Sequence, residues 1–175
     1  MERTLFKYFW FWLAYSFAGW IYEVALCFIH GEGFVNRGFN FGPYLPIYGF
    51  GGLLILVVFY RFKEKLNPIV MCIAISAFAA VIELIATYIL DLTGTGFHTL
   101  WDYSNRFANF DGRIALWPAL KFGLMGCLFI YLFQPQLEKI LNKPWRAKYI
   151  VTAVVALTIL ADSVYHIING SNFAG

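Results

Sequence analysis

Residues 69–90 read IVMCIAISAFAAVIELIATYIL, an apolar stretch in which Glu83 is the only charged side chain. A helix rises about 1.5 Å per residue and the hydrocarbon core of a bilayer is about 30 Å thick, so this stretch is long enough to cross a membrane. Four further apolar runs surround it, at about residues 5–29, 47–62, 114–133 and 149–168. The sequence therefore predicts an all-α protein: a polytopic transmembrane helical bundle of about five spans, forming one domain over residues 1–175.

The composition favours the same class of protein. Hydrophobic residues make up 61% of the chain and charged residues 13%, whereas a soluble domain is about half apolar and about a quarter charged. The segments between the runs are short, so we expect no separate soluble domain. An ATPase domain would then belong to another chain.

The lysines and arginines sort by side of the membrane. Nine lie around the start of the first run, between the second and third, or between the fourth and fifth, while the other connections hold only Arg37, Arg106 and Arg113. The positive-inside rule then predicts a multi-pass protein of the bacterial cytoplasmic membrane, with its N-terminus in the cytoplasm and its C-terminus outside. No basic stripe remains for nucleic acid, so we expect no nucleic-acid partner.

Four charged side chains lie six or seven residues from the predicted outer ends of their spans: Glu23, Glu83, Lys121 and Asp162. The helical rise would place all four roughly 9 to 10 Å below the outer boundary, where we expect them to meet. A lone charge there costs at least about 2.5 to 3.5 kcal/mol, so each should find a partner. The structural alternative is that Lys121 pairs with one acid and the other acids are neutral or reach upward to water.

Two predicted outer loops are rich in aromatic residues. Residues 34–49 read FVNRGFNFGPYLPIYG, which is too apolar for a solvated coil, so we expect a re-entrant or capping loop. Arg37 would either contact an anionic group of a ligand or tie the loop to a carboxylate such as Glu23. In the second loop, Asp102 and Tyr103 either contact a ligand or cap a turn between helices.

Metal, cofactor and redox chemistry are not predicted. His30, His98 and His166 fall on the outer side near Asp102, but no HxxxH or HExxH spacing accompanies them. Asp162 and His166 are four residues apart and share a helix face, which favours a local hydrogen-bonded pair over a catalytic dyad. The three cysteines lie within spans and are interpreted as small buried residues rather than disulfide partners.

Several motifs together are similar to a known family. They are Gly19-Trp20-x-x-Glu23, Asn36-Arg37-Gly38-Phe39, Gly42-Pro43, Pro46-Ile47-Tyr48-Gly49, Glu83, Trp101-Asp102-Tyr103-Ser104 and Gly112-Arg113. In order and spacing, over about residues 5–130, they resemble the bacterial family named putative ABC-transporter permeases of the CmpB type. The resemblance implies a small polytopic membrane protein of a transporter. Asn40 stands where the family usually has an apolar residue, and Lys121 and Asp162 match no motif position.

The leading hypothesis is a permease-like transporter subunit that binds a small solute in an outward-facing pocket. We expect no catalytic residue, and a solute with a cationic or hydroxyl-rich group, because carboxylates and aromatic faces both favour cations. Self-association or partner membrane and ATPase subunits are also expected, since five spans are few for a conduction path. The predicted ligand contacts are Glu23, Asn36, Arg37, Glu83, Asp102 and Arg113, with Trp20, Tyr48, Trp101 and Tyr103 as walls.

The sequence also allows two other classes of function. One is a membrane-embedded enzyme that uses Glu23 and Glu83 as acid and base on a lipid or envelope substrate, which predicts turnover by the purified chain alone. The other is a non-catalytic membrane partner, whose loops bind another envelope protein while the charged layer only fixes the packing of the helices.

Overall fold

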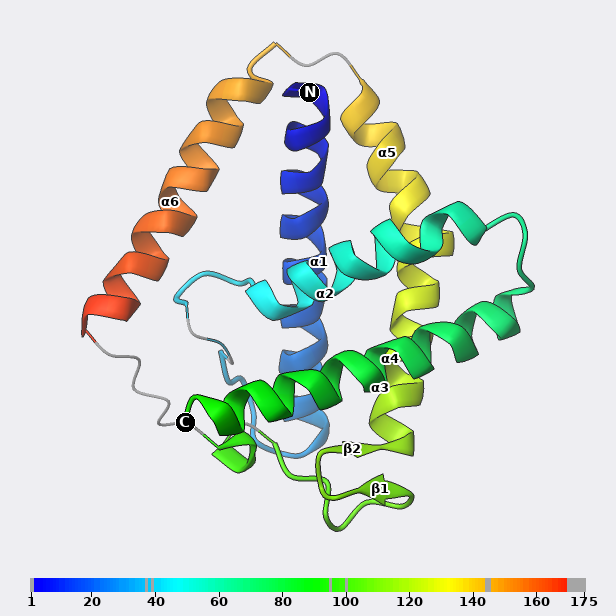
Figure 1. Cartoon of the computed structure of the whole chain (residues 1–175). Helices are drawn as coiled ribbons and strands as arrows, with labels where there is room; N and C mark the ends of the chain where they lie inside the picture. Colours follow the sequence, from blue (N-terminus) through cyan, green and yellow to red (C-terminus); the bar gives the residue numbers. More distant parts are fainter. Residues whose placement is uncertain are drawn as a thin grey trace. The chain divides into compact units, whose positions relative to one another are not determined.

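The structure is a computed structural model that describes residues 2–36, 38, 40–94, 96–99, 101–143 and 146–169 (Figure 1). Its described residues are mainly helical, with one short β-hairpin, so the all-α prediction is confirmed. The elements are α1 (Glu2–Ile29), α2 (Pro46–Phe59), the 3-10 helix η1 (Tyr60–Phe62), α3 (Pro68–Leu92), the 3-10 turn η2 (Phe97–Thr99), β1 (Asn109–Phe110), β2 (Ile114–Ala115), α4 (Leu116–Leu128), the π turn η3 (Phe129–Phe133), α5 (Gln134–Asn142) and α6 (Lys148–Asn169).

Four helices are long and apolar enough to cross a membrane: Thr4–Ile29, Pro68–Leu92, Leu116–Asn142 and Lys148–Asn169. They correspond to four of the predicted spans. The fifth, Pro46–Phe62, is a shorter apolar helix, and its crossing of the membrane stays a prediction. Large apolar side chains are exposed along these helices, for example Leu5 at 68% and Ile150 at 71%. Exposed apolar surface on this scale is typical of a protein embedded in lipid.

The helix of the fourth predicted span extends further than the sequence predicts. The sequence predicts that this span ends at about residue 133, just before Pro135, but α4, η3 and α5 form one helix that continues to Asn142. A proline lacks an N–H donor and its ring crowds the carbonyl four residues earlier. The π turn that directly precedes Pro135 changes the hydrogen-bond register at this point, so the helix continues through the proline.

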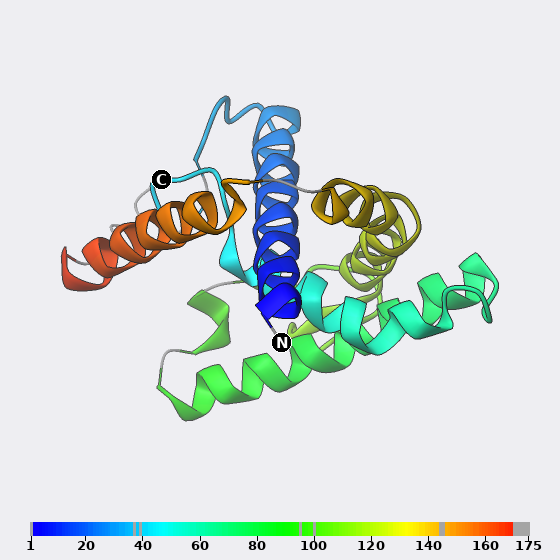
Figure 2. The same ribbon diagram turned by 90° about the horizontal axis from the view of Figure 1, so that it is seen from above.

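The structure divides into two compact units, Met1–Leu54 with Gln134–Gly175 (unit 1) and Ile55–Phe133 (unit 2). In unit 1, the loop after α1 turns back along that helix: the Leu45 amide donates to the Ser16 carbonyl at 3.0 Å, and Tyr44 and Leu45 are buried. Ser16 lies near the middle of α1, so the loop folds back against that helix. We call it the re-entrant loop, and its insertion into a membrane stays a prediction. Helix α6 diverges from α1 along its length, with the returning loop between their far ends (Figures 1 and 2).

Unit 2 is built on the packing of α3 against α4. Its core contains Phe59, Met71, Ile75, Cys127 and Ile130. Helix α4 meets α3 through glycines: a Cβ on Gly123 would lie 2.6 Å from the backbone oxygen of Cys72. Small residues of this kind let helix backbones approach closely in lipid. The hairpin β1–β2 precedes α4 and pairs Asn109 with Ala115 and Phe110 with Ile114.

Candidate functional site

The predicted ligand contacts come from both units, and each group is described by itself. Unit 1 holds Trp20, Glu23, Asn36 and Tyr48, and unit 2 holds Glu83, Trp101, Asp102, Tyr103 and Arg113. Arg37 lies outside the described residues. The meeting of Glu23, Glu83, Asp162 and Lys121 in one layer stays a prediction.

In unit 2, Glu83 on α3 and Tyr103 in the following loop form a hydrogen bond. The Tyr103 hydroxyl donates to Glu83 Oε1 at 3.0 Å. The other carboxylate oxygen, Oε2, is buried and has no hydrogen-bond partner within the described part of the chain. Burying a carboxylate oxygen without a donor is costly, because the group loses its water and gains nothing in exchange. Among the described residues, this oxygen therefore lacks the donor that would offset its burial.

Arg113, directly before β2 and α4, is enclosed by acids and aromatic rings. Its Nη1 lies 2.6 Å from Asp91 Oδ2 and its Nε lies 3.1 Å from Asp111 Oδ2. The guanidinium carbon lies 4.6 Å and 4.3 Å from the ring centres of Tyr88 and Phe97. The hydrogen bond that Arg113 donates to Asp91 is the largest of the causes that raise the pKa of the guanidinium. Arg113 thus ties the end of α3 to the loop, a role that the sequence did not predict.

Trp101 and the hairpin complete this cluster. Trp101 Nε1 donates to the carbonyl of Arg113 at 3.0 Å, and the Phe97 amide donates to Asp91 Oδ1 at 3.3 Å. Gly112 has a φ of +66°, and a Cβ there would lie 2.5 Å from Ser104 Oγ. A glycine fits this position because other residues rarely adopt such a φ. The Gly112-Arg113 motif of the sequence is therefore a turn that positions Arg113.

Asp102 is exposed and caps a turn. One oxygen, Oδ1, accepts from the Ser104 amide at 2.8 Å and from the Ser104 hydroxyl at 2.6 Å. These bonds, the hydroxyl first, hold the pKa of Asp102 below its ordinary value. Of the two alternatives left open for Asp102, this geometry fits the capped turn, and contact with a ligand stays a prediction.

Because the Asp102 carboxylate caps this turn, the stability of the fold depends on pH. A carboxyl with a lowered folded-state pKa stabilises the fold above its unfolded-state pKa, and this contribution is lost as the pH falls through the lowered value. Ser104→Ala removes the largest cause, so we expect the pKa of Asp102 to rise towards its ordinary value. NMR titration of the Asp102 carboxyl should detect the shift. Asn105→Ala, in the same exposed turn, is the control, and an equal shift in both variants would contradict the assignment.

In unit 1, two hydrogen bonds join the predicted contacts in pairs. The Tyr48 hydroxyl on α2 donates to Glu23 Oε1 on α1. Trp20 Nε1 donates to Asn36 Oδ1 at 2.5 Å, and the Asn36 amide donates to the Phe41 carbonyl at 3.1 Å. Gly19 makes the first pair possible, because a Cβ at this position would overlap the Tyr48 ring. The Gly19-Trp20-x-x-Glu23 motif thus brings one face of α1 against both α2 and the loop.

Asp162 on α6 holds the re-entrant loop. Its Oδ1 accepts from the Phe41 amide at 3.1 Å, and its Oδ2 accepts from the Gly42 amide at 3.1 Å and the Tyr44 hydroxyl at 2.7 Å. His166 Nε2 lies 3.6 Å from Asp162 Oδ1, so the two side chains share a helix face as predicted, at a distance beyond a hydrogen bond. Burial, together with the bond to Asp162, raises the pKa of Tyr44. Asp162 is therefore surrounded by donors from its own chain.

Asn40 belongs to the same anchor. Its side-chain amide donates to Ser163 Oγ at 2.8 Å and to the Tyr44 hydroxyl at 2.9 Å, and the residue is buried. Asn40 and Asp162, the two unit 1 positions that depart from the family motifs, thus act on one loop. Lys121 is exposed on α4. It forms no ion pair with Glu83 in the described part of unit 2, so the alternative in which it neutralises that acid is not supported.

A family model described as "Putative ABC-transporter type IV" matches residues 9–167. The chain belongs to this family. The match confirms the resemblance to CmpB-type proteins and extends it beyond the motifs, since it includes α5 and most of α6. Comparison with curated proteins and with solved structures gives no match. Together with the four long apolar helices, membership of the family makes the chain a membrane protein of a transporter family.

Proposed function

We propose that this chain is a permease-like subunit that binds a small solute through its intramembrane glutamates, in a pocket open to the outer face. Glu83 carries the proposal. Its carboxylate lies within a predicted span, one oxygen is held by Tyr103, and the other is buried without a partner among the described residues. Ionisable groups inside a membrane are expensive and commonly mark the path of a substrate or ion.

The charge around Glu83 favours a cationic or hydroxyl-rich solute. Arg113 is already paired with Asp91 and Asp111, so it offers little to an anion. In unit 1, Glu23 is held by the Tyr48 hydroxyl in the same way as Tyr103 holds Glu83 in unit 2. A carboxylate fixed by a tyrosine hydroxyl, with an oxygen still available, suits a ligand that brings a positive charge or an O–H donor.

Membership of the family supports a role in an assembly. The transporter description fits a chain that supplies the membrane part, with any ATP hydrolysis on a partner ATPase subunit. The positive-inside bias supports an orientation with Glu23 and the loops of residues 30–45 and 93–113 towards the outside of the bacterial cytoplasmic membrane. These are the orientation and setting that we propose for the chain.

Glu83→Gln tests the proposal because it keeps the size of the side chain and removes its charge. Native mass spectrometry of gently solubilised protein should find a retained small molecule on the unchanged chain. We expect the affinity for this molecule to fall at least tenfold in Glu83→Gln, a loss of at least about 1.4 kcal/mol of binding free energy, so its occupancy should fall. Uptake of that molecule by cells should fall in parallel.

Glu64→Gln is the matched control, because Glu64 is an exposed glutamate of the same unit in the link before α3. It should leave occupancy and uptake unchanged. Absence of any retained molecule, or full occupancy and uptake in Glu83→Gln and Glu23→Gln alike, would overturn the proposal. Turnover of an envelope lipid by the purified chain alone would instead favour the enzyme hypothesis.

A further inference from the structure

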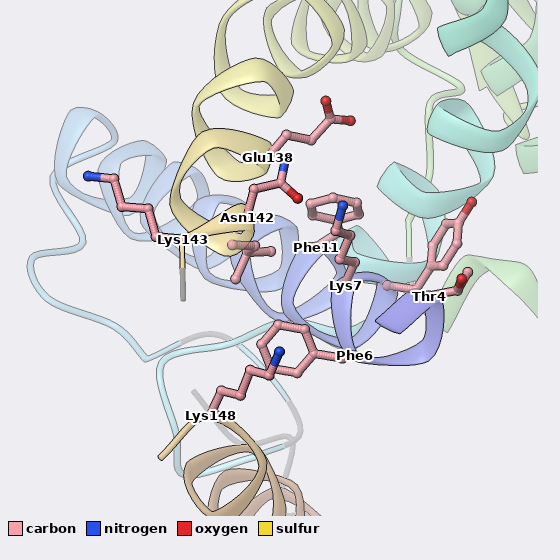
Figure 3. A pocket seen from close by; sticks show the side chains of 10 residues that line it. Thr4, Phe6, Lys7, Phe11, Glu138, Asn142, Lys143 and Lys148 are labelled. Carbon is pink, nitrogen blue, oxygen red and sulfur yellow. The ribbon is translucent and has the colours of Figure 1, made fainter. Parts of the chain in front are cut away.

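A cavity lies at the opposite end of unit 1 from the re-entrant loop. It measures about 460 Å³ and lies among the first turns of α1, the last turns of α5 and the start of α6 (Figure 3). A cavity of this size is within the usual range for a small-molecule site. The residues that line it are Thr4, Phe6, Lys7, Tyr8, Phe11, Glu138, Leu141, Asn142, Lys143 and Lys148.

The lining carries an excess of positive charge. Three lysines face one carboxylate, and that carboxylate, Glu138, already accepts from Gln134 Nε2 at 2.9 Å. Lys7 and Lys143 form no ion pair with an acid of the described residues. In Figure 3 the side chains of Lys7 and Lys148 run beside the aromatic rings, while that of Lys143 extends away at the rim. An anion in the cavity would therefore meet ammonium groups from separate helices.

The walls of the cavity are fixed by contacts between α1 and α6. The Lys148 ammonium group lies 5.5 Å from the ring centre of Phe6 and 4.8 Å from that of Tyr149. The Phe6 and Tyr149 ring centres are 6.0 Å apart, and Trp10 Nε1 donates to Thr152 Oγ1 at 2.9 Å one turn further along. Because these contacts already order Lys148, less side-chain entropy is lost when an anion binds.

The surroundings of the cavity point to a lipid rather than a free anion. All three helices that line it belong to long apolar helices that could cross a membrane, and the cavity lies at their ends, where headgroups would be. Large apolar side chains next to the lining residues are exposed: Leu5, Ile140 and Ile150. A headgroup phosphate could contact the lysines while the acyl chains cover these side chains. A basic pocket between membrane helices on the cytoplasmic side is a known way to bind anionic headgroups.

We infer that this cavity binds the headgroup phosphate of an anionic phospholipid of the inner leaflet, through Lys7 and Lys148. The site is separate from the glutamates of the proposed function. Delipidated protein titrated with phosphatidylglycerol, and separately with phosphatidylcholine, tests it by native mass spectrometry. We expect phosphatidylglycerol to bind at least tenfold more tightly to the unchanged chain, and the double variant Lys7→Gln/Lys148→Gln to lose at least tenfold in this affinity.

The control is Lys65→Gln/Lys139→Gln, which removes the same charge from exposed lysines that do not line the cavity. It should change the affinity less than twofold, and Lys7→Arg/Lys148→Arg should keep most of the binding if the lysines act as cations. Thermal unfolding of each variant shows whether it folds. Equal binding of the two lipids, equal losses in the test and control pairs, or displacement of phosphatidylglycerol by millimolar inorganic phosphate would overturn the inference.

Discussion

Asp162→Ala should release the re-entrant loop and lower the free energy of unfolding by about 3 to 5 kcal/mol. The carboxylate accepts from two backbone amides, those of Phe41 and Gly42, and from the Tyr44 hydroxyl. Its side chain is 12% exposed, so water cannot fully replace these bonds. Removing the acceptor leaves several donors unsatisfied at once, and each unsatisfied donor costs about 1 to 3 kcal/mol when it is buried.

Two measurements can assign the loss of unfolding free energy in Asp162→Ala to the re-entrant loop. Unfolding of the detergent-solubilised chain by SDS gives the change in free energy, and hydrogen exchange of the segment 40–45 should become faster at the Phe41 and Gly42 amides. Tyr44→Phe removes one of the three bonds to Asp162, together with the bond from Asn40, and should cost about 1 to 2 kcal/mol. Thr158→Ala is the control on the same helix, because its hydroxyl donates to the Val154 carbonyl of α6 itself and not to the loop among the described residues. Unchanged exchange in Asp162→Ala would contradict the anchor.

Hydropathy predicts the helices of this protein well because lipid offers no hydrogen-bond partners to the backbone. Each apolar run must satisfy its own N–H and C=O groups, so a run of sufficient length becomes a helix. The same reasoning located the re-entrant loop, since residues 34–49 are too apolar to remain in water. It could not locate the end of the helix that begins with α4. A proline usually ends a helix, and a π turn that accommodates a proline has no simple sequence signal.

The contacts of the candidate site were less predictable than the helices. Asp162 and the amides of Phe41 and Gly42 are about 120 residues apart, and no local pattern links a carboxylate to backbone groups so distant in sequence. The ion pair between Asp91 and Arg113, by contrast, could have been predicted from the sequence. An acid in the last turn of one span and an arginine at the start of the next face the same boundary when the two helices are antiparallel neighbours.

The close packing of α3 against α4 gives the second large effect. Gly123→Ala places a methyl group 1.9 Å from Ser76 Oγ and 2.6 Å from the backbone oxygen of Cys72. The serine hydroxyl can rotate away, but the carbonyl belongs to α3 and moves only with that helix. The two helices must therefore separate around Met71 and Ile75, which are fully buried. We expect the free energy of unfolding to fall by about 3 kcal/mol, at the upper end for overpacking of a core.

Gly51→Ala is the matched control because Gly51 also lies within a helix but has open space where its Cβ would stand. Alanine favours a helix over glycine by about 1 kcal/mol, so this variant should be neutral or slightly stabilising. The double variant Gly123→Ala/Ser76→Ala separates the two clashes. It removes the hydroxyl and leaves the carbonyl, so it should recover only part of the loss. Full recovery would assign the effect to Ser76 alone and would contradict backbone contact as the reason that α4 has a glycine at this position.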